Sequence, residues 1–159
     1  MNKTISVWLI VEEGKNNGKV ALQRRALGES FPFVCQATWS GGVENNEEPM
    51  DAVKRECCEE MGEKFCSEFN FLDLEFLTKT KFFRKSIQSN WECWHYTGKV
   101  SEKTIGLAKL HKEASPDFIF VGKNDEFFSL DDEKDTKNKI VLFGDQRDIL
   151  KNLLNNNGD

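Results

Sequence analysis

The chain has 159 residues, of which 38% are hydrophobic and 31% charged, and its formal net charge is −5. This composition excludes a disordered chain, and the length predicts one folded domain over residues 1–159 with its own hydrophobic core. No apolar run approaches the roughly 20 residues that span a bilayer, and no signal-peptide cleavage site follows the first apolar residues. We therefore expect a soluble cytoplasmic protein without a membrane segment.

Strands are expected in both halves of the chain. Residues 4–13 and 19–26 are rich in β-branched and apolar residues and flank the turn cluster GKNNG, which predicts a hairpin. Further extended segments are expected at residues 69–83, 89–100, 117–122 and 125–130. A last helix is expected over residues 144–154, followed by a frayed tail at 155–159. Strands that alternate with helices predict an α/β protein.

One helix is predicted in the first half, over Pro49–Met61. A proline suits the first turn, and Val53, Cys57 and Met61 recur four residues apart, as on one buried face of a helix. Gly62 follows the last of these residues and is typical of a helix C-terminus. The sequence therefore places an amphipathic helix at the centre of its most acidic segment.

The negative charge is concentrated in this segment. Residues 47–63 hold seven acidic and two basic residues, and seven minus two equals the whole excess of five. The rest of the chain sums to zero and shows no basic stripe, so we expect no extended nucleic acid as a partner. So much like charge on one loop and helix costs stability unless a cation relieves it.

The five cysteines do not fit a disulfide framework. Their number is odd, and Cys57 and Cys58 are adjacent, which favours reduced thiols. Cys93 and His95 lie two residues apart and share one face of an expected strand. Strand packing explains that pair better than a zinc site does, because no paired C-x-x-C spacing accompanies it.

The carboxylates of the predicted helix share one stripe. Glu56, Glu59 and Glu60 lie at offsets of three and four, which brings them onto one side of a helix. Mg²⁺ prefers oxygen ligands and takes one or two carboxylates together with substrate phosphates. The glycine pair at 41–42 lets the backbone approach an ion, and Arg55 can hold a neighbouring carboxylate by a bidentate contact. The pattern predicts a divalent-cation site.

Residues 41–63 resemble the Nudix box, G-x5-E-x7-R-E-U-x-E-E-x-G-U, where U is a bulky aliphatic residue. The seven fixed positions match at the correct spacings and are Gly41, Glu47, Arg55, Glu56, Glu59, Glu60 and Gly62. The departures are Cys57 and Glu63 at the two aliphatic positions, and Trp39 and Ser40 where many relatives have proline and glycine. None of these departures removes a metal ligand.

The resemblance implies the Nudix fold, an α/β/α sandwich with a mixed β-sheet, and a Mg²⁺-dependent enzyme in which Mn²⁺ can substitute. It implies that Glu59 and Glu60 are the principal metal-binding carboxylates. Glu56 is then a third ligand or the base that deprotonates water. Arg55 is expected to orient a carboxylate, and Glu47 to support the set.

Residues outside the helix are expected to complete the site. In some Nudix relatives the residue before the box glycine offers its backbone carbonyl to the metal, and here that residue is Ser40. A late acidic residue often joins the site, and the candidates in order are Glu126, then Asp125 and Glu113. From their position on the second strand, Arg24 and Arg25 are candidates for contacts with substrate phosphate.

The implied activity is hydrolysis of the diphosphate linkage in a nucleoside diphosphate linked to another moiety. The box does not say whether that moiety makes a nucleotide sugar, a dinucleoside polyphosphate, a modified nucleotide or a coenzyme. Homodimers are common in the family. One alternative is a sensing module that has lost catalysis, although this chain keeps its carboxylates. Another is an isoprenoid diphosphate isomerase, which needs a cysteine where this chain has Ser40.

Overall fold

The expected hairpin opens the fold. The computed structural model describes residues 2–156. Strand β1 (Asn2–Glu12) pairs antiparallel with β2 (Val20–Arg24), and Ile10 lies opposite Val20. Along its other edge β1 pairs in parallel with β6 (Ser89–Ser101) over its whole length. β1 therefore lies in the middle of the sheet.

The sheet is mixed, as the resemblance implied. Its strand order is β5-β6-β1-β2-β3-β9-β8, with β4 paired to β1 and β7 paired to β2. The remaining strands are β3 (Cys35–Gln36), β4 (Trp39–Gly42), β5 (Glu75–Arg84), β7 (Ile119–Val121), β8 (Phe128–Ser129) and β9 (Val141–Leu142). Strand β5 lies at one edge and forms a long antiparallel hairpin with β6.

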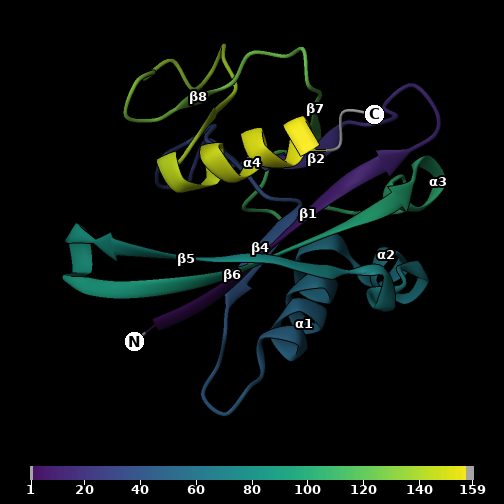
Figure 1. Cartoon of the computed structure of the whole chain (residues 1–159), viewed down its shortest axis with the longest axis horizontal. Coiled ribbons are helices and arrows are strands. Elements are labelled where there is room, and N and C mark those ends of the chain that lie inside the picture. The colour runs from purple at the N-terminus through teal and green to yellow at the C-terminus, as the bar shows by residue number, and fades with distance from the viewer. Residues whose placement is uncertain (1, 157–159) are drawn as a thin grey trace.

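Two longer helices cover opposite sides of the central strands (Figure 1). Helix α1 (Pro49–Met61) has the predicted bounds and ends at Gly62, whose φ of 84° is one that glycine adopts readily. Helix α4 (Gly144–Asn156) runs two residues further than expected, so the predicted tail at 155–159 is helical at its start, and residues 157–159 lie outside the described range. The expectation of an α/β/α sandwich is confirmed.

Shorter helical segments connect these elements. They are α2 (Glu63–Glu68), α3 (Glu102–Ile105) and the 3₁₀ turns η1 (Phe71–Asp73) and η2 (Lys85–Ile87). Across residues 2–156, no helix has both the length and the apolar character needed to cross a membrane.

Strand β1 separates two hydrophobic clusters because its side chains alternate between the faces of the sheet. Ile5, Val7 and Leu9 pack in the cluster that includes the buried face of α1. Trp8 and Ile10 pack in the cluster that includes the buried face of α4. All five side chains are nearly or fully buried, which fixes α1 and α4 against opposite faces of one strand.

The prediction of reduced thiols is wrong for one pair of cysteines. Cys58 of α1 and Cys66 of α2 form a disulfide, with their Cα atoms 5.1 Å apart. The turn at Gly62 folds α2 back beside α1, which brings together two residues eight positions apart. The remaining cysteines are buried and free.

The Cys93–His95 pair serves strand packing. Trp8 Nε1 donates to Nδ1 of His95 (3.1 Å), and Nε2 of His95 lies 2.9 Å from Oγ1 of Thr80. An indole nitrogen can only donate, so Nδ1 of His95 is unprotonated and Nε2 donates to Thr80. Burial lowers the pKa of His95 to about 4. A neutral imidazole therefore links β1, β6 and β5.

Candidate functional site

The site forms where α1 faces strand β4. The Ser40 N–H donates to Oε1 of Glu60 at 3.2 Å, while β4 pairs with β1. The N–H and C=O of one strand residue point to the same edge, so the Ser40 carbonyl also faces α1 and not β1. This orientation makes the Ser40 carbonyl available beside the carboxylates, as the sequence analysis expected of a backbone ligand.

Gly41 allows Glu56 to lie against the strand. A Cβ atom at position 41 would lie 2.1 Å from Cδ of Glu56, well inside van der Waals contact. A Cβ at Gly42 would meet nothing within 4 Å. The box glycine is therefore required by the close approach of a carboxylate, whereas its neighbour has room for a side chain.

Arg55 joins the carboxylates at one end of the stripe. Its Nε and Nη2 each lie 3.0 Å from an oxygen of Glu47, in a bidentate pair, and its Nη1 lies 2.8 Å from Oε1 of Glu56. Nη2 also donates to the Gly42 carbonyl at 2.7 Å. The hydrogen bond to Glu47 raises the pKa of Arg55, and the same bond lowers the pKa of Glu47. Arg55 thus fixes Glu47 and Glu56 relative to β4.

Glu60 occupies the more enclosed end of the stripe. Its Oε1 accepts hydrogen bonds from the Ser40 N–H and from Nε2 of Gln23 (3.3 Å), which are both neutral donors. Burial raises the pKa of Glu60 to about 8, and the charges of Glu56 and Glu113 act in the same direction. The enclosure thus disfavours the charged form of this carboxylate.

Gln23 and His111 complete the Glu60 end of the stripe, and the sequence analysis identified neither residue. Buried Gln23 donates to the Thr38 carbonyl at 2.7 Å and has its Oε1 3.0 Å from Nε2 of His111. Burial lowers the pKa of His111, and its Nε2 lies 4.0 Å from Glu60. A neutral His111 that donates to Gln23 forms a hydrogen bond there and no ion pair with Glu60. Neither residue belongs to a motif that could have identified it.

The structure separates the two arginines proposed for phosphate contacts. Side chains alternate along a strand, so Arg25 shares the face of Gln23 while Arg24 points to the other. Arg24 lies beside Cys35 and donates to the Lys139 carbonyl at 3.4 Å. Arg25 donates to Ser30 at 2.6 Å, and its charge acts on His111. Only Arg25 therefore lies on the side of the candidate site.

The late acidic candidates are also separated. Glu113 lies near enough to Glu60 for its charge to raise the pKa of that carboxylate. Glu126 is exposed in the loop before β8, where its charge acts on Lys139, and no contact with box residues is recorded for it in residues 2–156. Asp125 accepts a hydrogen bond from the Gly122 N–H at 2.7 Å. The geometry favours Glu113 over the two others.

The donors at this place fit a hard divalent cation. Glu56 and Glu60, whose side chains are 13% and 19% exposed, offer inward-facing oxygens, as does the Ser40 carbonyl. Glu59 is 58% exposed and lies 3.7 Å from Arg55, at the rim. Within the described part of the chain no three His, Cys, Asp or Glu side chains form a ready metal cluster. The chemistry of the donors suits Mg²⁺, with the protein supplying only part of the coordination.

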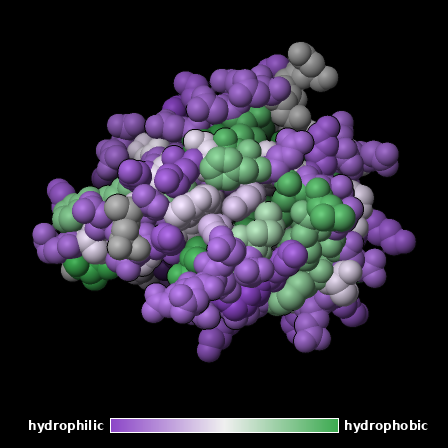
Figure 2. Space-filling model, turned by 60° about the horizontal axis from the view of Figure 1, so that its bottom comes forward, coloured by the Kyte–Doolittle hydropathy of each residue, from purple (hydrophilic) through white to green (hydrophobic). Residues whose placement is uncertain are grey.

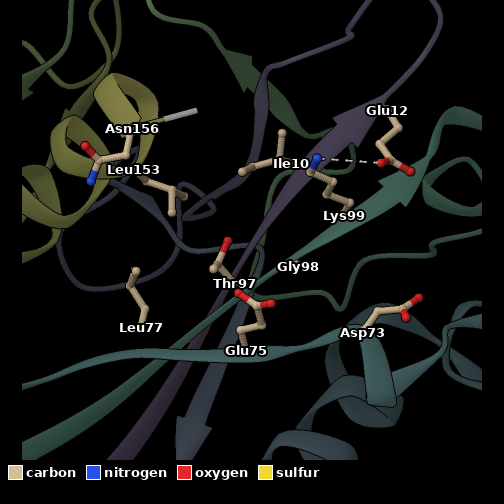
Figure 3. A pocket seen from close by; sticks show the side chains of 10 residues that line it. All are labelled: Ile10, Glu12, Asp73, Glu75, Leu77, Thr97, Gly98, Lys99, Leu153 and Asn156. Carbon is tan, nitrogen blue, oxygen red and sulfur yellow. Dashed lines mark ion pairs between the residues drawn. The ribbon is translucent and has the colours of Figure 1, made fainter. Parts of the chain in front are cut away.

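Two hollows lie at different distances from the carboxylate stripe. A polar hollow of about 900 Å³ lies between the loop before α1, the start of β1 and Trp94 of β6, and Glu47 lines it. A cavity of about 610 Å³ lies between the C-terminal end of α4 and the β5–β6 strands, where Glu12 pairs with Lys99 at 3.9 Å (Figure 3). The second cavity contains no residue of the box. The first adjoins Glu47 and is therefore the better candidate for substrate.

The comparisons with known proteins identify the family and the fold. The family model of the NUDIX domain matches residues 2–145. A NUDIX hydrolase from Alicyclobacillus acidocaldarius is 13% identical, with a TM-score of 0.64 over 98% of this chain and 91% of that one. A MutT/nudix family protein from Enterococcus faecalis is 19% identical, with a TM-score of 0.63 over 94% of this chain and 60% of that one.

A third structure contains a ligand. It is the NUDIX domain of NrtR from Shewanella oneidensis in complex with ADP ribose, 16% identical, with a TM-score of 0.60 over 94% of this chain and 83% of that one. A comparison with curated protein sequences finds no significant match. The structural likenesses establish the shared fold, and the family model covers most of the sequence. With its box residues gathered around strand β4 in this fold, the chain belongs to the Nudix family.

Proposed function

We propose that the protein is a Mg²⁺-dependent hydrolase that cleaves the diphosphate linkage of a nucleoside diphosphate joined to another moiety. The observation that carries the proposal is the pair of enclosed carboxylates, Glu56 and Glu60, held beside the Ser40–Gly41 backbone. Burying two carboxylates side by side costs free energy unless a cation joins them. The sequence expectations of one domain, a cytoplasmic location and a possible homodimer belong to the same proposal.

The oxygens of Glu56, Glu59, Glu60 and the Ser40 carbonyl would hold the metal ion. When bound, the ion supplies neutralisation of diphosphate charge and a more acidic bound water. Gln23 and the Ser40 N–H orient Glu60 through its Oε1. The second oxygen of Glu60 accepts no recorded hydrogen bond from residues 2–156, which keeps it available as a ligand.

Glu56 is the proposed base that takes the proton of the attacking water. Its side chain is only 13% exposed, and burial raises its pKa, which makes it a stronger proton acceptor. Arg55 holds one oxygen of Glu56 at 2.8 Å and is itself held by Glu47. The bidentate Arg55–Glu47 pair therefore positions Glu56 and influences the reaction through that residue. On the other flank, Arg25 is the proposed contact for substrate phosphate.

The polar hollow beside Glu47 supports a substrate larger than inorganic diphosphate. Its volume of about 900 Å³ lies within the range of ligand sites, roughly 300–1,000 Å³. ADP ribose, the ligand of the NrtR domain, is itself a nucleoside diphosphate joined to a sugar. That ligand supports the class of substrate and leaves the second moiety to be identified.

A substrate panel tests the proposal. The purified protein is incubated with Mg²⁺, with Mn²⁺ or with EDTA and a set of nucleotide sugars, dinucleoside polyphosphates, modified nucleotides and coenzymes. The Glu59→Gln/Glu60→Gln variant is assayed beside it, and Glu63→Gln/Glu68→Gln on α2 is the control with the same change of charge. We expect metal-dependent release of a phosphate-containing product from one class, lost in the first variant only.

Two results would count against the proposal. Equal turnover by the Glu59→Gln/Glu60→Gln variant would remove the metal assignment. Tight binding of one compound without turnover, in the presence of either metal, would favour a sensing module in place of a hydrolase.

A further inference from the structure

The β5–β6 hairpin projects beyond the rest of the fold. Its distal end lies away from α1 and α4 (Figure 1), and Figure 2 shows hydrophobic side chains among hydrophilic ones at this end of the molecule. Phe83 and Ile87 are 51% and 55% exposed. An exposed apolar tip on an edge hairpin costs solubility when it has no partner, so a binding role deserves to be sought.

The hairpin is basic in an acidic protein. Residues 76–91 contain four cations and no acidic residue. The cations are Lys79, Lys81, Arg84 and Lys85. We call these four, with Phe83 and Trp91, the hairpin surface. Its charge of +4 contrasts with the net charge of −5 of the whole chain.

The cations remain accessible despite one acidic neighbour. Glu92 lies 3.9 Å from both Lys79 and Lys81. Its side chain is only 13% exposed, whereas that of Lys81 is 69% exposed, so the carboxylate lies beneath the lysines. Lys79 and Lys3 of β1 both lie over the ring of Trp94, at 5.3 and 5.6 Å. Lys79 of β5 and Lys3 of β1 therefore lie on one face of the sheet, together with Trp94 of β6.

Aromatic rings and Arg84 lie on the opposite face of the hairpin, because Phe82 and Arg84 are an odd number of residues from Lys79, Lys81 and Phe83 along β5. Arg84 lies over the ring of Trp91 at 4.5 Å, and Phe82 stacks on Trp91 at an interplanar angle of 14°. A hollow of about 280 Å³ lies at this place, lined by Lys81, Phe82, Phe83, Asn90 and Trp91. Its volume is near the lower end for small-molecule sites, about 300 Å³. A flat ring that enters this hollow would lie beside the Asn90 amide and the Lys81 cation.

Accessible cations beside an exposed aromatic side chain suit a polyanion that carries flat rings. Single-stranded nucleic acid is such a polymer, because its bases stack on aromatic side chains while its phosphates pair with Lys and Arg. We propose that the hairpin surface binds a single strand of nucleic acid, with a base on Phe83 and phosphates at Lys79, Lys81 and Lys85. This inference concerns binding and does not rest on the proposed hydrolysis.

A second copy of the chain fits the hairpin less well. β5 is an edge strand, and edge strands can pair with their own copies. In a two-fold antiparallel pairing of β5 centred on Thr80, Lys79 of each copy would face Lys81 of the other, and like charges that face each other across strands destabilise the pairing. The charge of the hairpin surface thus favours an anionic partner.

The test measures binding of a fluorescent 12-nucleotide single strand by anisotropy in EDTA, which prevents hydrolysis. Neutralising three phosphates predicts a slope of log affinity on log salt of about −2.1, or roughly 20-fold weaker binding at 200 mM than at 50 mM salt. In Lys79→Glu/Lys81→Glu the slope should fall to about −0.7 as two contacts are lost. Lys64→Glu/Lys151→Glu, with the same change in net charge on α2 and α4, should keep the wild-type slope.

Removing the aromatic face separates nucleic acid from other polyanions. Phe83→Ser should weaken strand binding at least about fivefold, while Leu72→Ser, a 92% exposed leucine outside the hairpin, should not. Circular dichroism of every variant checks that it is folded.

Three results would overturn the inference. The first is no binding at 50 mM salt. The second is binding that the two charge-reversal variants weaken equally, or that inorganic polyphosphate matches while Phe83→Ser has no effect. The third is a dimer, detected by light scattering, that the Lys79→Glu/Lys81→Glu variant dissociates, because a second copy would then be the occupant.

Discussion

The two ends of the carboxylate stripe on α1 differ in how their negative charge is compensated. At one end Arg55 forms a fork with Glu47 and contacts Glu56 at 2.8 Å. At the other end Glu60 receives hydrogen bonds only from the neutral Gln23 side chain and Ser40 N–H among the described residues. The chain carries its own cation at the first end, and at the second the charge of Glu60 has no positive partner of comparable strength.

This difference separates the end of the stripe that Arg55 stabilises from the end that is proposed to bind a cation. The fork orients Glu56 permanently, because an arginine remains charged at all physiological pH values. Glu60 has a raised pKa of about 8, so a bound cation would favour its charged form. In the proposed function, the first end supplies stability and the second end binds the cation.

The largest expected effect follows from neutralising the proposed base. Glu56→Gln keeps an oxygen for the Arg55 contact but cannot accept a proton, so kcat should fall by roughly 10²–10⁴-fold with the fold retained. Steady-state kinetics at saturating Mg²⁺ measure the change. Glu44→Gln, a 71% exposed carboxylate 3.9 Å from Arg55, should leave kcat unchanged. A fully active Glu56→Gln enzyme would transfer the base to another residue.

Removing the fork should have the next largest effect. In Arg55→Gln the carboxylates of Glu47 and Glu56 lose their shared cation and their orientation. We expect a loss of roughly 10–100-fold in kcat/KM, as for residues that orient metal ligands. Arg55→Lys keeps the charge without the bidentate contact and should recover only part of the loss. Full recovery by lysine would mean that charge alone matters here; Lys54→Gln, on the exposed side of the same helix, is the control.

The adjacent glycines Gly41 and Gly42 offer a matched pair. In Gly41→Ala the new methyl group would overlap Cδ of Glu56, 2.1 Å away, so the flexible carboxylate must move. We expect kcat to fall about tenfold or more with little change in thermal stability. Gly42→Ala meets nothing within 4 Å and should behave as the wild type. Equal effects of the two substitutions would contradict the close-approach explanation.

The smallest expected effect is a pH dependence of stability without metal. The carboxyl of Glu60 has a pKa of about 8 in the folded chain and 4.5 ordinarily. Between these values the unfolded chain has lost the proton that the folded chain retains. Stability should therefore fall as pH rises from 4.5 to 8, by up to about 1.4 kcal/mol per pH unit from this group.

Urea unfolding in EDTA at pH 5.5, 6.5, 7.5 and 8.5 measures that slope. Glu60→Gln should flatten the curve, and Glu63→Gln, an exposed carboxylate on α2, should not. Adding Mg²⁺ should stabilise the protein most at the alkaline end, where the ligand is ionised. An identical slope in Glu60→Gln would show that other groups carry the pH dependence.

Local patterns predicted the elements that local forces determine. The four-residue recurrence of Val53, Cys57 and Met61 predicted α1, since those side chains form its buried face. The alternating and β-branched segments predicted β1 and β6, which pair over their full lengths. The spacing of the box predicted which carboxylates share a stripe. In each case the relevant residues lie within a few helical turns or along one strand.

Local sequence patterns could not predict the contacts made across the sheet. Gln23 and His111 are 88 residues apart and meet only because β2 passes beside the segment that follows α3. The positive face of the hairpin combines Lys3 with Lys79 over Trp94, although these two lysines lie far apart in the chain. The disulfide depends on the turn at Gly62. Register and turn geometry decide these contacts, and a single sequence specifies neither directly.

The buried imidazole of His95 has a consequence for experiments on the hairpin. Because Trp8 can only donate, the acceptor at Nδ1 must stay unprotonated for both hydrogen bonds to persist. With a pKa near 4, this ring keeps the same proton from mildly acidic to alkaline buffers. The hydrogen bonds of His95 that connect β5 and β6 to β1 should therefore not change over this pH range. Any response of strand binding to pH in that interval would originate in the ligand or in the surface it contacts, with the scaffold acting as a fixed reference.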